Sequence, residues 1–253
     1  MSLYNELDRR WSPNYDRHST AKAVKPHFAA VLNVLVEIDA KRSAANANKN
    51  LSDVGRADEL RNFAPTLAPA MARARGAISG AKEALARQRA NLAPVPKDRN
   101  DIASAILRSD VRRFNQGKPV AEIIRMAESD STVMEAIFEG PAALSGLTVE
   151  VRDNILKSYL EKHAAPQLAA ISEQQEAIAL IETGIGAASS ALADVAGIQP
   201  AAFDAWLLEK APREARVAAE AFAPPTKSAS TPDEFFEKLL SEGRAELAAI
   251  MAS

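Results

Sequence analysis

Apolar residues recur at alternating spacings of three and four over long stretches of this chain. This spacing places them along one side of an α-helix, and when it is sustained it is typical of long helices that pack side by side. In the first stretch, residues 19–46, the repeating positions are Val24, Phe28, Val31, Leu35 and Ile38. The pattern stops at the polar sequence NANKNLSD, which predicts a turn.

A second stretch keeps the same spacing as far as Leu92, and it begins at about Val54 or at Pro65. Pro65 and Pro69 lie near its start. Because proline lacks a backbone donor and clashes with the preceding helical turn, we expect a kink or a late start there. The repeating positions are Leu67, Met71, Ala74, Ile78, Ala81 and Leu85. The sequence APVPKD, residues 93–98, predicts the end of this helix.

The third stretch, residues 166–195, contains Gly184 and Gly186 in the sequence ETGIGAASS, which invites comparison with a dinucleotide-binding loop. Such a loop requires a buried strand directly before the glycines and a helix after them. Here a helical seam passes through both glycines instead, and no strand pattern precedes it. We therefore predict a continuous helix. The seam positions are Ile171, Gln174, Ile178, Ile181, Ile185, Ala188, Leu192 and Val195.

Between the second and third stretches, short helical patterns alternate with glycine, proline and serine breaks. One helix is marked by Ile102, Ile106 and Val111. Two more follow, the second of them with Asp130 or Ser131 as its N-cap, and another begins at Thr148. The apolar positions of the two middle helices are Val120, Ile123, Ile124, Ala127, Val133, Met134, Ile137 and Phe138. These patterns predict a compact head of short helices.

The whole pattern predicts an all-α fold, namely an elongated antiparallel helical bundle with coiled-coil-like long helices and a region of short helices. No segment alternates apolar and polar residues for long enough to indicate a strand. The expected divisions are an N-terminal arm (1–19), a long helical hairpin (20–97), the short-helix region with the long helix that completes the bundle (98–197), short helices (198–222), a linker (223–231) and a C-terminal helix (232–253).

Both ends of the chain are candidate contact segments. At the C-terminal end, Thr231 is a predicted N-cap, Pro232 takes the first helical position and Glu234 completes a capping box. Each end is joined to the body through a polar or proline-rich tract, so we expect intermolecular contacts. The aromatic residues of the N-terminal arm could equally pack on the chain's own helices. The candidate interaction residues are Tyr4, Trp11, Tyr15, Phe235, Phe236 and Leu239.

The composition of the chain excludes several kinds of chemistry. Hydrophobic residues make up 47% of the chain, aromatic residues only 5%, and the formal net charge is −2. This balance gives no reason to expect a polyanionic partner. The chain has no cysteine, which excludes disulfides, thiolate catalysis and cysteine-based zinc sites. We find no secretory signal pattern and no run of about 18 apolar residues, so we expect an intracellular protein that does not span a membrane.

No catalytic, cofactor-binding or metal-binding motif emerges. The sequence GAISGAKE, residues 76–83, departs from a phosphate-binding loop in spacing and lacks the magnesium-binding hydroxyl. The histidines do not pair at helical spacing. We therefore expect a non-enzymatic protein without cofactors. A locally basic stretch is a candidate for weak nucleic-acid contact, or else it is a solvated face beside the seam. Its residues are Arg73, Arg75, Lys82, Arg87 and Arg89.

Residues 121–178 contain the block EAIFEGPAALSGL, then a helix, then His163-x-x-Pro166 and a long helix. This segment resembles uncharacterised all-helical proteins encoded among the virion genes of tailed bacteriophages and prophages of proteobacteria. The resemblance implies a structural or assembly role in a phage particle, as a capsid-interior, portal-associated or scaffolding component. It implies as partners the chain itself and virion proteins such as portal and capsid, in the virion or the host cytoplasm. The alternative is a cellular helical adaptor or regulator that binds a partner through a helix groove.

Overall fold

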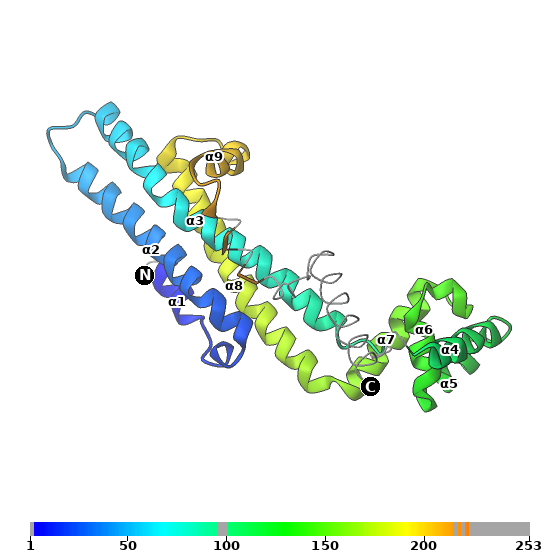
Figure 1. Ribbon diagram of the computed structural model, residues 1–253. Coiled ribbons are helices and arrows are strands. Elements are labelled where there is room, and N and C mark those ends of the chain that lie inside the picture. Colours follow the sequence, from blue (N-terminus) through cyan, green and yellow to red (C-terminus); the bar gives the residue numbers. More distant parts are fainter. Residues whose placement is uncertain (1–2, 96–100, 215–216, 219–220, 223–253) are drawn as a thin grey trace, which may run out of the picture.

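The computed structural model describes residues 3–95, 101–214, 217–218 and 221–222. Throughout these ranges the chain is built from α-helices and short 3₁₀-helices, and no strand occurs among the described residues (Figure 1). This confirms the predicted all-α class. The linker (223–231) and the C-terminal helix (232–253) expected from the sequence lie outside the described residues.

Three long helices, α2 (Ser19–Ala47), α3 (Asp53–Ala90) and α8 (Ala165–Ala196), lie side by side (Figure 1). A short turn reverses the chain between α2 and α3. Two contacts fix the direction of α8 against α3: Arg75 Nη2 donates to Ser189 Oγ at 3.1 Å, and Lys82 Nζ donates to Glu182 Oε1 at 2.5 Å. Residue numbers rise on one helix as they fall on the other, so α3 and α8 are antiparallel, and α8 runs parallel to α2.

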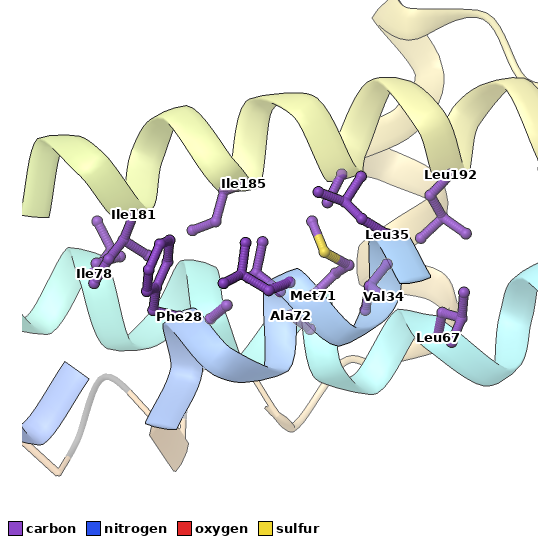
Figure 2. Close-up of a cluster of buried hydrophobic side chains, with 14 of the residues drawn as sticks. Phe28, Val34, Leu35, Leu67, Met71, Ala72, Ile78, Ile181, Ile185 and Leu192 are labelled. Carbon is purple, nitrogen blue, oxygen red and sulfur yellow. The ribbon is translucent and has the colours of Figure 1, made fainter. Parts of the chain in front are cut away.

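The core of this bundle is made by the repeating apolar positions of the three helices. All the seam positions identified from the sequence in α2, α3 and α8 are buried. Figure 2 shows Phe28 and Leu35 of α2, Met71 of α3, and Ile181 and Ile185 of α8 gathered in the space between the helices. Dispersion contacts and removal of apolar surface from water hold the three helices together.

Helix α3 starts at the earlier of its two expected positions. Ser52 caps it by accepting a hydrogen bond from the Gly55 amide at 3.2 Å. The helix then continues without interruption through Pro65 and Pro69. Because Ala64 and Leu67 beside the prolines are buried in the bundle core, tertiary packing offsets the loss of backbone donors there.

Helix α8 continues through Gly184 and Gly186, as predicted, and no strand precedes them. A Cβ atom at Gly184 would lie 3.5 Å from Phe28 Cε2 and 3.5 Å from Val31 Cγ1. The glycine therefore faces α2 inside the core. By length and apolar composition alone α8 could cross a membrane, but half of its most apolar window is buried within the protein, as expected of a core helix.

Both flanking segments pack on the bundle. Helix α1 (Leu3–Arg9) and the 3₁₀-helix η1 (Tyr15–Arg17) lie where the arm was expected, and Leu7 of α1 is buried in the bundle core. After α8 come the 3₁₀-helix η3 (Pro200–Ala202) and α9 (Phe203–Lys210), which packs on α3. Part of the short helix expected over residues 211–222 lies outside the described residues.

The head contains α4 (Ile102–Asn115), α5 (Val120–Ser129), α6 (Ser131–Glu139), the 3₁₀-helix η2 (Ala142–Ser145) and α7 (Val149–His163) (Figure 1). Its apolar core is separate from that of the bundle. The core residues are Ile123, Ala127, Val133, Met134, Ile137, Ala142, Leu147 and Ile155. The head is therefore a second packed unit inserted between α3 and α8.

Local signals position the helices of the head as expected. Asp130 caps α6 by accepting from the Thr132 amide at 2.7 Å, and Thr148 caps α7 by accepting from the Val151 amide at 3.2 Å. Gly146, with φ of 70°, makes the left-handed turn between η2 and α7. Leu147 is buried, whereas Leu144 is 47% exposed.

Candidate functional site

Helix α4 turns its apolar residues toward solvent. The side chains of four large apolar residues are more than half exposed, namely Ile102 (74%), Ile106 (59%), Leu107 (54%) and Phe114 (61%). Large exposed apolar residues that share one side of a helix mark a candidate interaction site. We call these four residues the α4 outer face.

The opposite side of α4 buries polar residues. Arg108 is only 4% exposed and Asn115 is fully buried. Helix α4 packs on α6 and η2 through this side. An amphipathic helix normally places its apolar stripe against the core. The sequence pattern identified the helix correctly through Ile102, Ile106 and Val111, but the first two of these residues face away from the head core.

Two ion pairs compensate the charges of the arginines on this side. Arg108 donates to Glu139 Oε1 through Nε at 3.1 Å and through Nη2 at 2.9 Å. Arg112, one helical turn later, donates to Glu139 Oε2. The Arg108 and Arg112 hydrogen bonds hold the pKa of the Glu139 carboxyl below its ordinary value, and the bond to Glu139 raises the pKa of Arg108. The contact between α4 and α6 therefore includes ion pairs beside Val111, which packs on the head core, and the four residues of the α4 outer face stay on the outside.

The charges beside the α4 outer face are balanced. Asp110 and Arg113 are both exposed, and Arg113 Nη1 lies 3.7 Å from Asp110 Oδ1. Lys118 Nζ lies 4.3 Å from the centroid of the Phe114 ring, which is a cation–π contact. Lys118 is itself ion-paired with Glu122, so each base beside this apolar surface has an acidic partner. Such a surface is suited to a protein partner with the same balance, rather than to a polyanion.

The N-terminal candidates lie against the chain's own bundle. The Trp11 ring stacks on Phe28, with centroids 5.4 Å apart, and its Nε1 donates to Asp16 Oδ1 at 3.2 Å. Tyr15 meets the Trp11 ring edge-on at 5.5 Å, and Tyr4 packs on the same core. This is the alternative that the sequence left open for these aromatic residues. The C-terminal candidates Phe235, Phe236 and Leu239 lie outside the described residues.

The candidate basic stretch is mostly engaged in contacts within the chain. Arg75 is ion-paired with Asp204 of α9, Lys82 with Glu182 of α8, and Arg87 with Glu83. Arg73 faces His27, whose pKa is lowered first by burial and then by this arginine. Arg89 is exposed. Because these residues point to different sides of α3 and several carry acidic partners, they do not form one continuous basic surface.

A cavity of about 830 Å³ lies between the head and the end of the bundle. Its walls include Ile124 of α5, Met134 of α6 and Ile155 of α7, with Glu135 and Lys162 among the polar groups. Among the described residues no cluster of three or more metal-ligating side chains occurs. Ser158 and His163 also line the cavity, but among the described residues no hydrogen bond joins them, so we take the α4 outer face as the candidate site.

Comparison with known proteins gives no relative from which to transfer a role: no protein-family model, curated protein or solved structure matches this chain.

Proposed function

We propose that this chain is a non-enzymatic assembly protein that associates with further copies of itself through the α4 outer face. The observation that carries the proposal is the inverted polarity of α4, which buries Arg108 and exposes Ile106 and Phe114. Keeping large apolar side chains in water is unfavourable by about 25 cal/mol per Å², so a surface of this kind gains stability when a partner covers it.

A second copy is the partner that the charges favour. In a two-fold interface each residue pairs with the corresponding surface of the other copy. The exposed pair Asp110 and Arg113 gives every copy one acidic and one basic group next to its apolar residues. Two such surfaces are complementary in charge without any other component.

The setting we propose is a bacteriophage particle, in which the chain is a capsid-interior, portal-associated or scaffolding component. The support for this setting is the resemblance of residues 121–178 to virion-associated helical proteins. Recovery of the protein from purified particles, measured by mass spectrometry, is the expected result. Its absence from both particles and assembly intermediates would contradict the phage setting while leaving self-association intact.

Light scattering over a range of protein concentrations tests self-association. We expect the mass to rise above the 27.1 kDa of one chain and the Ile106→Glu plus Phe114→Glu variant to stay at one chain. Val54→Glu is the matched control, because Val54 is 70% exposed but belongs to the bundle. A monomeric wild-type chain, or an unchanged mass in the α4 variant, would refute the proposal. A heterologous complex formed in place of self-association would favour the cellular adaptor.

A further inference from the structure

The α3–α8 groove is filled along one part of its length and open along the next. Arg75 bridges this groove to Ser189, and α9 covers it there through the ion pair of Asp204 with Arg75. One heptad further along α3, the ion pair of Lys82 with Glu182 crosses the same groove. Here an open hollow of about 430 Å³ follows.

The floor of this hollow is apolar and its rim is charged. Leu85 and Ala86 of α3 and Ile178 of α8 line it. Arg89 stands at its rim, exposed, and has no ion-pair partner in the part of the chain that the structure describes. Glu182, the acidic group at the rim, is already paired with Lys82. Among the described residues, the unpaired charge at the rim of the hollow is therefore positive.

The last described residue of the chain lies at the level of this hollow along α3, on another side of that helix. Arg87 Nη2 donates to the Phe222 carbonyl oxygen at 2.6 Å, and Arg87 is one residue from Ala86 and two from Arg89 on α3. The segment that follows Phe222 thus leaves from the side of α3 at the level of the hollow. The nine residues 223–231 span up to about 30 Å when extended. Half the circumference of a helix about 10–12 Å in diameter is roughly 16–19 Å, which is shorter than this.

The sequence of residues 232–253 is complementary to this hollow in its apolar residues and in its charge. At helical spacing, one face carries Phe235, Phe236, Leu239, Leu240, Leu247, Ile250 and Met251. The charged residues of 231–253 are the acids Asp233, Glu234, Glu237, Glu242 and Glu246 and the bases Lys238 and Arg244. The segment is therefore both amphipathic and net acidic.

We propose that residues 232–253 form a helix that docks into the hollow of the same chain. Its apolar face covers Leu85, Ala86 and Ile178, and its acidic residues approach Arg89. The docked segment continues the cover that α9 provides over the earlier part of the α3–α8 groove. The C-terminal segment then binds the bundle of its own chain, whereas the α4 outer face binds other copies of the chain.

Cross-linking between introduced cysteines tests this placement, because the chain has no cysteine of its own. The pair Ala86→Cys with Leu239→Cys, treated with a short bismaleimide, is expected to give an intramolecular cross-link at the mass of one chain. The control pair is Asn50→Cys with Leu239→Cys, since residue 50 lies in the α2–α3 turn at the far end of the bundle (Figure 1). Equal cross-linking of both pairs, or cross-linked dimers alone, would overturn the proposal.

Limited trypsin digestion gives an independent measurement, because Lys238 and Arg244 are cleavage sites inside the segment. Replacing Phe235 and Leu239 with serine is expected to speed cleavage there about tenfold, since the loss of two buried apolar anchors weakens docking by at least that factor. The control replaces Ala248 and Ala249, on the opposite face, with serine and should cleave at the wild-type rate. Equal rates in all three proteins would refute the docked helix.

Discussion

Arg108 makes two hydrogen bonds to the same carboxylate oxygen of Glu139, through Nε at 3.1 Å and Nη2 at 2.9 Å. This pair joins α4 to α6 across 31 residues of sequence. Because Arg108 is almost fully buried, its charge depends on Glu139 for compensation. The orientation of α4, and with it the exposure of the α4 outer face, follows from this contact.

Replacing Glu139 with glutamine is expected to destabilise the head. The variant removes the carboxylate to which the buried Arg108 guanidinium is hydrogen-bonded, so the melting temperature measured by circular dichroism should fall by several degrees. Glu135→Gln is the matched control, because Glu135 Oε2 lies 3.9 Å from Arg108 Nη1 and makes no hydrogen bond with it. A larger effect at Glu135 than at Glu139 would contradict the assigned roles.

The same carboxyl should make stability depend on acid pH. Its folded-state pKa is lowered by the hydrogen bonds from Arg108 and Arg112, so the unfolded chain binds the proton first. The stabilisation is complete above the ordinary value of 4.5 and is lost as the pH falls through the lower folded-state pKa. The urea unfolding free energies of wild type and Glu139→Gln should therefore approach each other as the pH falls below 4.5 and through the lowered folded-state pKa. Curves that stay parallel down to pH 2.5 would argue against this linkage.

Alanine at Gly184 is expected to stabilise the bundle. The new methyl group would lie 3.5 Å from both Phe28 and Val31, which is ordinary contact distance, and alanine favours a helix interior over glycine by about 1 kcal/mol. The free energy of unfolding in urea should rise by about that amount. Gly146→Ala is the contrasting variant. Its φ of 70° and a Cβ contact of 3.1 Å to Gln116 Cα predict destabilisation. A loss of stability at Gly184 would mean that α2 and α8 are already in closest contact there.

Leucine at Asn115 is expected to stabilise the head. The Asn115 side chain is fully buried, and among the described residues neither its Nδ2 nor its Oδ1 has a hydrogen-bond partner. Burying an unpaired polar group costs about 1–3 kcal/mol, and leucine, which has the same branched shape with a somewhat larger volume, removes that cost. Thermal unfolding of Asn115→Leu should shift upward by a few degrees. A downward shift would show that the amide group forms bonds that the structure does not contain.

Alanine at Trp11 is expected to weaken folding without changing association. Trp11 packs on Phe28 at 5.4 Å, so truncation should reduce the free energy of unfolding by about 2 kcal/mol, as for a partly buried aromatic residue. The mass measured by light scattering should equal that of the wild type. A lower mass in Trp11→Ala at a concentration where the protein stays folded would instead place this residue in an interface.

The bundle could be predicted from the sequence because the apolar spacing within each long helix shows which side of that helix is buried. The spacing of Val24, Phe28, Val31, Leu35 and Ile38 alone determines which side of α2 is buried, and the same holds for α3 and α8. Burial along a long helix also overrides single unfavourable residues, which is why Pro65 and Gly184 interrupt neither helix.

The head was less predictable because its packing depends on contacts distant in sequence. The pattern of α4 locates the helix but does not say that Arg108 and Arg112 will find Glu139 on α6. A sequence signal does exist: two arginines four residues apart on one helix and the acids Glu135 and Glu139 with the same spacing on another. Only the fold shows that these pairs meet.

The insertion of the head between two antiparallel helices has a consequence for how the protein diversifies. The chain leaves the bundle at the end of α3 and returns at the start of α8, and each unit has its own core. Substitutions in the α4 outer face therefore do not alter the packing of α2, α3 and α8. Changes to the surface of one unit thus leave the apolar core of the other in place.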